Sequence, residues 1–213
     1  MRADDDLLAG YVSGPAAATE ATAVALARAD RARVVVLVEG VSDQIAVETL
    51  ARRHGRDLAA EGVVVLPVGG AHGIARYLRR FGPEGTGVRL AGLCDAGEAH
   101  VVRQALASTG LGTPGSADLE RLGFFVCVED LEDELIRAAG PARVREVFAA
   151  HGDLVRFRTI QRQPAWRGRD EAAQSRRFLG AGGRRKLRYA RLLTEAIDAD
   201  RMPRPLTGLL AVV

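Results

Sequence analysis

Carboxylate side chains follow three apolar runs of the sequence, 34–38, 88–94 and 124–128, within five residues of the end of each run. They are Glu39 and Asp43 after the first run, Asp95 and Glu98 after the second, and Glu132 after the third. Clustered carboxylates repel each other unless a cation or a retained proton lies among them. Mg²⁺ prefers oxygen ligands and is commonly held by a few carboxylates together with substrate phosphates. These residues therefore predict a Mg²⁺ or Mn²⁺ site for phosphodiester chemistry, provided that the three runs are neighbouring strands.

The apolar runs themselves have the character of buried strands. The run 34–38 reads Val-Val-Val-Leu-Val, a continuous β-branched pattern typical of a strand covered on both faces. A fourth run, 63–66, is of the same kind, and helical spacing of apolar residues separates the runs. Strands that alternate with helices predict parallel βαβ units, and ligands bind at the carboxyl ends of such strands. We therefore predict an α/β fold with a four-stranded, mainly parallel sheet flanked by helices.

The predicted domain organisation has three parts. Residues 1–30 form an N-terminal segment and helix, 31–135 form the α/β core, and 136–213 form a helical extension packed on the core. From 131 onward only helical patterns occur, near 131–138, 141–151, 170–179, 183–198 and 205–212.

Basic residues and glycines supply the predicted contacts to nucleic acid. The chain carries a net charge of +3 with a pI of about 9.3, which permits nucleic-acid binding without requiring it, and 153–191 is rich in Arg. The contact residues that we predict are Gly69, Gly70, His72, Arg184 and Arg185. The Gly pair leaves room for a phosphate, and His72 is placed to contact it or transfer a proton. The alternative is a set of solvated charged faces.

Lys186 is the single lysine among 30 basic residues. It lies three, seven and eleven residues before Tyr189, Leu193 and Ile197, so it shares the apolar stripe of its helix. A lysine on the inward side of a helix needs an anion or a carboxylate partner. The alternative is a side chain that extends past the apolar surface into solvent.

The composition favours the reducing cytoplasm. Cys94 and Cys127 each lie within an apolar run and are expected to be buried thiols, and no stretch approaches the ~20 apolar residues of a membrane span. The start of the sequence does not have the pattern of a signal peptide.

The acidic motifs resemble those of Toprim domains, and among these they are most similar to the overcoming-lysogenization-defect (OLD) family of nucleases. Residues 38–43, Val-Glu-Gly-Val-Ser-Asp, resemble the first Toprim motif, and 93–98, Leu-Cys-Asp-Ala-Gly-Glu, resemble the Asp-x-Asp motif. Residues 130–134 resemble the acidic motif after the last core strand. Lys186 resembles the lysine near the end of those nuclease domains, and the likeness covers roughly 33–198.

The resemblance implies a Toprim-like Rossmannoid core with a nuclease centre that uses Mg²⁺ and favours DNA. In that centre Glu39, Asp43, Asp95 and Glu132 would be metal ligands. Glu39 and Lys186 would be the catalytic residues, with Lys186 stabilising transition-state charge. Two ions about 4 Å apart would activate water and stabilise the leaving oxygen.

The chain departs from the family pattern in two ways. Gly97 stands where the second Asp of the Asp-x-Asp motif is expected, so either Glu98 reaches in with its longer side chain or one metal site is weak or absent. The sequence also has no Gly-x-x-x-x-Gly-Lys-Ser/Thr loop, although this family usually carries an ATPase domain. It is similar to stand-alone, actinobacterial-type Toprim proteins, for which an ATPase partner would be a separate protein. A homodimer remains open.

Other functions remain open as well. A degenerate Toprim module that binds nucleic acid or a partner ATPase without cutting is favoured by Gly97. Nucleotidyl transfer, as in primases, uses the same core. With two cysteines the chain lacks primase-type zinc ligands, which weighs against a primase but does not exclude the chemistry. A receiver-like phosphoacceptor fits poorly, because of the long helical tail and the spacing of Glu39 and Asp43.

Overall fold

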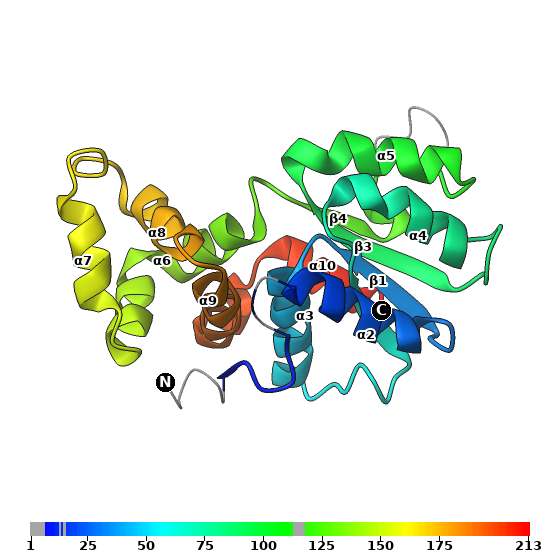
Figure 1. The fold of residues 1–213 in the computed structure, drawn as a ribbon, viewed down its shortest axis with the longest axis horizontal. Helices are drawn as coiled ribbons and strands as arrows, with labels where there is room; N and C mark the ends of the chain where they lie inside the picture. Colours follow the sequence, from blue (N-terminus) through cyan, green and yellow to red (C-terminus); the bar gives the residue numbers. More distant parts are fainter. Residues whose placement is uncertain (1–6, 13, 15, 113–117) are drawn as a thin grey trace.

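The computed structural model describes residues 7–12, 14, 16–112 and 118–213. Its centre is a four-stranded sheet made of β1 (Val34–Val38), β2 (Val63–Pro67), β3 (Arg89–Asp95) and β4 (Phe124–Cys127). The strand order is β2-β1-β3-β4, and every neighbouring pair is parallel (Figure 1). The predicted α/β fold with a four-stranded sheet is confirmed.

The strand order places a topological switch between β1 and β3. The chain leaves β1 towards β2 on one side and returns to β3 on the other, so a crevice opens at the carboxyl ends of β1 and β3. Leu37 of β1 pairs with Gly92 of β3. A side chain at Gly92 would meet the ring of Phe124 and the carbonyl of Leu37, because an added Cβ would lie 2.5 Å from the ring and 2.9 Å from the carbonyl oxygen. Glycine here permits the close packing that brings the two strand ends together.

Helices cover both faces of the sheet. Val34, Val36 and Val38 pack with α3 (Val41–Arg53) and α10 (Arg204–Ala211). Val35 and Leu37 face the other side, where the sheet is covered by α2 (Ala17–Ala29), α4 (Ile74–Phe81) and α5 (Ala99–Ser108). This alternation along β1 explains why the whole run is apolar, since both of its faces are buried.

The remaining helices form a second group beside the sheet (Figure 1). They are α6 (Leu131–Ala150), α7 (Leu154–Arg162), α8 (Glu171–Gly180) and α9 (Gly183–Ala196). Helix α6 is kinked at Gly140, which has φ 73° and precedes Pro141, so it corresponds to the two predicted helices 131–138 and 141–151. We call α6 to α9 the helical extension.

An aromatic cluster holds the helical extension together. Phe148, Phe157, Phe178 and Tyr189 come from its four helices, and their ring centroids lie 4.8 to 6.2 Å apart. Helix α7 was not predicted, because Phe157 is its one fully buried residue and the surrounding sequence is dominated by Arg.

Two expected segments fall partly outside the described residues. They are the loose start at 1–15 and the loop at 110–116, since 1–6, 13, 15 and 113–117 are not described. Within the described ranges, no helix combines the length and the apolar character needed to cross a bilayer.

Candidate active site

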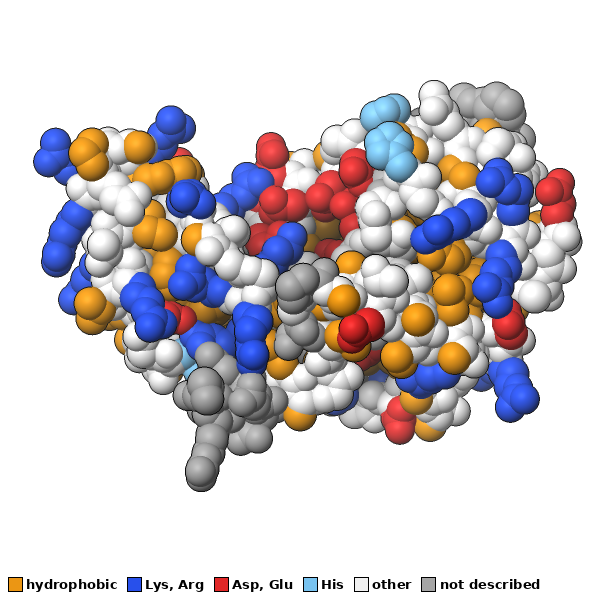
Figure 2. Space-filling view, viewed as in Figure 1, with side chains coloured by type: hydrophobic (Ala, Val, Ile, Leu, Met, Phe, Trp, Pro, Cys, Tyr) orange, Lys and Arg blue, Asp and Glu red, His pale blue; other side chains and the backbone are white. Residues whose placement is uncertain are grey.

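A cavity of about 230 Å³ opens at the carboxyl edge of the sheet, where the helical extension meets it. Figure 2 shows Asp and Glu side chains gathered in the hollow between the two parts of the molecule. The lining residues are Glu39, Gly40, Ser42, Asp43, Gly70, Asp95, Asp130, Leu131, Glu132 and Lys186. The structure therefore brings together four of the five predicted ligands and the predicted catalytic lysine. We call this space the carboxylate cavity.

Glu39 and Asp95 are linked directly across the switch point. The backbone N–H of Asp95 donates a hydrogen bond of 2.9 Å to Oε1 of Glu39. Burial raises the pKa of Glu39 to about 7; the N–H of Asp95 opposes this rise, while the charges of Asp95 and Glu98 add to it. Glu98 is the fifth predicted ligand, and its carboxyl group lies close enough to Glu39 to hydrogen bond with it.

Asp43 is buried in the first turn of α3. Its Oδ2 accepts a hydrogen bond of 2.7 Å from the N–H of Gly40, which fixes the carboxyl group against the turn after β1. Burial raises the pKa of Asp43 to about 7, and the charge of Glu132 raises it further. The same causes act on Asp95, whose pKa is also raised to about 7 by burial and by neighbouring carboxylates, Asp43 first among them. Three carboxyl groups are therefore poised to retain protons near neutral pH.

Lys186 enters the cavity from the first turn of α9. Its Nζ lies 3.1 Å from Oε2 of Glu132, so the lysine has the carboxylate partner that its place on the helix demands. Burial acts to lower the pKa of Lys186, but Glu132 and then Asp43 raise it overall, so the amine stays charged. The other oxygen of Glu132, Oε1, is buried and has no hydrogen-bond partner in the described part of the chain.

The donor set of this cavity fits a hard divalent cation. All candidate ligands are carboxylate oxygens, the preference of Mg²⁺ and Mn²⁺, and one of these oxygens is buried without a partner. Among the described residues, however, no three Asp, Glu, His or Cys side chains already form a metal-binding group. Asp43 is held by Gly40 and Glu132 by Lys186, so these carboxylates would have to turn to share one ion.

The glycine pair after β2 lies at the rim of the cavity. Gly69 and Gly70 have φ values of 77° and 97°, and both donate N–H groups to the carbonyl of Glu39, at 3.1 and 3.2 Å. The pair thus holds the end of β1 in place. Gly70 lines the cavity, while Gly69 and His72 are exposed.

Arg184 and Arg185 do not line the carboxylate cavity. Both face a second cavity on the helical extension. Arg184 also lines a pocket that includes Gly40, Ser42 and Lys186, three residues that line the carboxylate cavity as well. Arg185 donates a hydrogen bond of 3.0 Å to the carbonyl of Phe178 and stacks on its ring, with 4.2 Å between the guanidinium carbon and the ring centroid.

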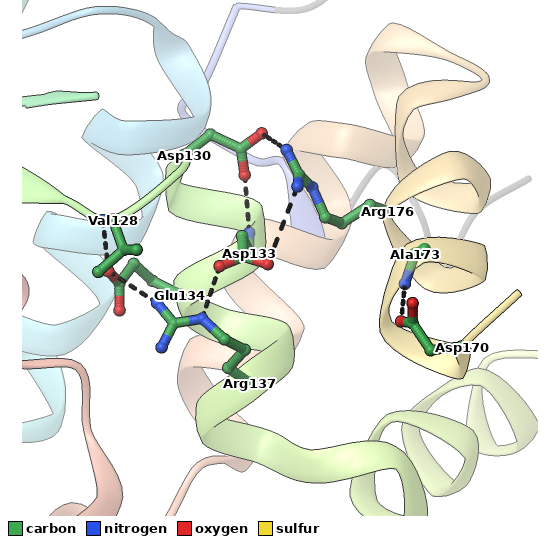
Figure 3. A network of polar contacts seen from close by, with 8 residues as sticks. All are labelled: Val128, Asp130, Asp133, Glu134, Arg137, Asp170, Ala173 and Arg176. Atoms are coloured by element: carbon green, nitrogen blue, oxygen red, sulfur yellow. Dashed lines mark hydrogen bonds and ion pairs between the residues drawn. The ribbon is translucent and has the colours of Figure 1, made fainter. Parts of the chain in front are cut away.

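The sequence analysis missed the polar network at the start of α6, which Figure 3 shows. Asp130 lines the carboxylate cavity, accepts a hydrogen bond of 2.7 Å from the N–H of Asp133, and bonds to Arg176 of α8 at 2.7 Å. Arg137 bridges Asp133 and Glu134, at 2.6 and 2.9 Å. Asp130 belongs to the acidic motif 130–134, and an Asp before a predicted helix is also a capping signal. Nothing local in the sequence connects Asp130 to Arg176.

The comparisons with known proteins agree with this geometry. A family model described as "Overcoming lysogenization defect protein-like, TOPRIM domain" matches residues 32–96, which contain Glu39, Asp43 and Asp95. The chain resembles the OLD-like Toprim domain. This match ends before Glu132 and Lys186, and no curated protein sequence matches the chain.

Solved structures extend the OLD-like resemblance beyond residues 32–96 at the level of the fold. The C-terminal region of the Xanthomonas campestris pv. campestris OLD protein superposes with a TM-score of 0.66 at 24% identity, covering 84% of this chain and 91% of that one. The C-terminal region of the Burkholderia pseudomallei OLD protein gives a TM-score of 0.61 at 22% identity, covering 85% and 96%. The likeness to the fold of these regions therefore extends well beyond residues 32–96.

Proposed function

We propose that this chain is a metal-dependent phosphodiesterase that cuts nucleic acid, in the manner of an endonuclease and with a preference for DNA. The observation that carries the proposal is the carboxylate cavity: acids from three strand ends meet there with a single lysine, and burial raises the pKa of three of them to about 7. Such a site has an excess of negative charge that a divalent cation and a phosphate can balance together.

The proposed roles follow from these contacts. Asp43, Asp95, Glu132 and Glu39, with Glu98 beside them, would hold Mg²⁺ or Mn²⁺. When bound, such an ion supplies Lewis-acid activation of water and neutralises charge on the phosphate. Glu39, with a pKa of about 7, suits proton exchange with water near neutral pH. Lys186, once released from Glu132, would bind a phosphate oxygen.

The rim residues complete the proposed substrate path. Gly70 would let a phosphodiester approach the carboxylates closely, with Gly69 and His72 on the exposed side of the entrance. The family resemblance also favours a separate ATPase as a partner protein. A reducing compartment such as the cytoplasm suits Cys94 and Cys127, which are both buried free thiols.

A second candidate is a binding module that does not cut. The feature that favours it is Gly97, which stands in place of an acidic ligand although a Cβ there would have no atom within 4 Å. Space for a side chain exists at this position, so close packing does not explain the missing carboxylate.

Cleavage of supercoiled and linear DNA, with Mg²⁺, Mn²⁺ or a chelator, tests the proposal. Asp95→Asn should lower the cleavage rate by at least about 100-fold, the upper end of the cost of losing even an outer-shell partner of a metal. Asp30→Asn is the matched control, because Asp30 is exposed and precedes β1 at the opposite edge of the sheet. Cutting in chelator, or equal rates for the two variants, would contradict the mechanism. DNA binding without any cutting would favour the binding module.

A further inference from the structure

The helical extension contains a second charged cavity, of about 190 Å³, which the proposed hydrolysis does not use. Its walls carry four guanidinium groups and one carboxylate. The lining residues are Leu8, Asp153, Arg156, Arg184, Arg185 and Arg188. We call this space the arginine cavity.

A buried hydrogen-bond network fixes the floor of the arginine cavity. Asp153 is 2% exposed and accepts hydrogen bonds from Arg156 at 3.1 Å, from Tyr189 at 2.9 Å, and from Arg188. Arg188 is also buried and donates to the hydroxyl of Tyr189 at 3.0 Å. These contacts hold guanidinium groups in place before any ligand arrives, which lowers the entropy cost of binding one.

Helix α9 lies between the two cavities and contributes residues to both. Arg184 and Arg188 are four residues apart and both line the arginine cavity, while Lys186 lines the carboxylate cavity. Arg184 also lines a third pocket together with Lys186. Arg185 also lines the arginine cavity, where it is anchored by Phe178. The first turn of α9 therefore presents positive charge to both spaces.

The positive charge of the chain is concentrated around this cavity. Residues 153–191 contain eleven Arg and one Lys but only three acids, whereas the whole chain has a net charge of +3, so the remainder is net negative. Figure 2 shows Lys and Arg side chains spread over the helical extension, next to the hollow that holds Asp and Glu. A polyanion that reaches the carboxylate cavity would therefore meet favourable potential on the extension and unfavourable potential elsewhere.

We propose that the arginine cavity binds a backbone phosphate of the nucleic acid whose scissile phosphate lies in the carboxylate cavity. This inference rests on the proposed function and adds a second contact point to it. Guanidinium groups suit phosphate because their planar donors match its oxygens in pairs. The two cavities lie on different sides of α9, and an α-helix is about 10–12 Å wide with its side chains, so they would hold two different phosphates of the nucleic acid.

Binding of fluorescent oligonucleotides in a chelator tests the site without cleavage. The test variant is the double substitution Arg156→Gln with Arg184→Gln, because both side chains are exposed. The matched control is Arg31→Gln with Arg79→Gln. It removes the same charge from exposed positions near the amino edge of the sheet. We expect the test variant to bind at least about tenfold more weakly and to lose about 0.7–0.9 in salt slope for the lost phosphate. Equal affinities and equal salt slopes for the two double variants would overturn the site.

Further measurements separate this site from the hydrolase and from misfolding. Asp95→Asn should not weaken oligonucleotide binding in chelator, because it removes a negative charge from the carboxylate cavity and leaves the arginine cavity intact. If no variant ever cuts DNA but the arginine variant alone binds weakly, the hydrolase fails and the phosphate site stands. If DNA is cut at subsaturating concentration equally by both double variants, the phosphate site fails and the hydrolase stands. Arg184→Lys with Arg156 intact keeps the positive charge, so it should keep the salt slope and the thermal stability of the wild type and bind more tightly than the double variant. This result would exclude a folding defect as the cause of weak binding.

Discussion

Replacement of Asp43 by Asn tests whether ionisation of the buried Asp43 carboxyl group destabilises the folded protein. Asn has the shape of Asp and can still accept the N–H of Gly40, so the turn after β1 should be kept. The substitution removes a carboxyl group that is 9% exposed and whose pKa is raised from 3.8 to about 7. Burial raises the pKa of Asp43, and the charges of Glu132 and Glu39 raise it further. The N–H of Gly40 and the charge of Lys186 oppose the rise in pKa.

The sign and size of the Asp43→Asn effect follow from proton linkage. Between pH 4 and pH 7 the unfolded chain releases the proton of Asp43 while the folded chain keeps it, so stability falls as the pH rises through the folded pKa of about 7. At about 1.4 kcal/mol for each pH unit, the rise from pH 5 to pH 7 costs the wild type about 2–3 kcal/mol that the variant does not lose. The pKa of Asp95 is raised partly by Asp43, which adds to the difference in the same direction.

Thermal unfolding in chelator at pH 5 and pH 8 measures this difference. For a chain of this length, about 2–3 kcal/mol corresponds to roughly 5–10 °C in Tm. The quantity to compare is the Tm of Asp43→Asn minus the Tm of the wild type. This difference should be larger at pH 8 than at pH 5 by that amount, whereas the same difference for Asp30→Asn should not change with pH. Added Mg²⁺ at pH 8 should raise the Tm of the wild type more than that of Asp43→Asn, because a ligand that binds the folded state stabilises it. A Tm difference that is the same at both pH values would refute the reasoning.

Two further substitutions test the support of the site. Arg176→Ala should lower Tm in chelator by about 2–4 °C, since Arg176 bonds Asp130 at 2.7 Å and a partly exposed pair is worth up to about 1 kcal/mol. Added Mg²⁺ should raise the Tm of this variant by more than it raises the Tm of the wild type. A smaller rise in the variant would contradict a role of Arg176 in balancing the charge of the carboxylate cavity. Gly92→Ala should destabilise the protein by about 1–3 kcal/mol in denaturant titrations, because its Cβ would lie 2.5 Å from the ring of Phe124. Gly97→Ala, with open space around the Cβ, is the control, and equal losses in the two would argue against close packing at Gly92.

The sheet and its acidic edge could be predicted because both are local patterns. A parallel strand buried on both faces must be apolar along its whole length, and β1 is predicted to the residue as 34–38. The residue after such a strand lies at the carboxyl edge, so Glu39 could be placed before the strand order was known. Val128 was expected to end the fourth strand, but β4 ends at Cys127, one residue earlier.

Contacts between distant helices could not be predicted in the same way. The stripe on α9 indicated that Lys186 faces inward, but its partner Glu132 lies 54 positions earlier in the chain, and no periodicity encodes that distance. Arg184 and Arg185 were expected beside Lys186 at one nucleic-acid surface. Each residue of an α-helix turns about 100° from its neighbour, so Arg185 and Lys186 line different cavities, whereas Arg184 lines one pocket together with Lys186. Helix α7 escaped prediction because one buried aromatic residue, Phe157, anchors it.

The return of α10 to the sheet has a mechanical consequence. Gly208 of α10 lies so close to Phe125 of β4 that an added Cβ would be 2.4 Å from the ring. After α9 the chain therefore returns to the sheet and packs against it. The helical extension, α6 to α9, is thus attached to the sheet at both of its ends. Attachment at two points limits how far the helical extension can move away from the sheet. Lys186, on α9, is consequently kept close to the acidic residues at the ends of the strands.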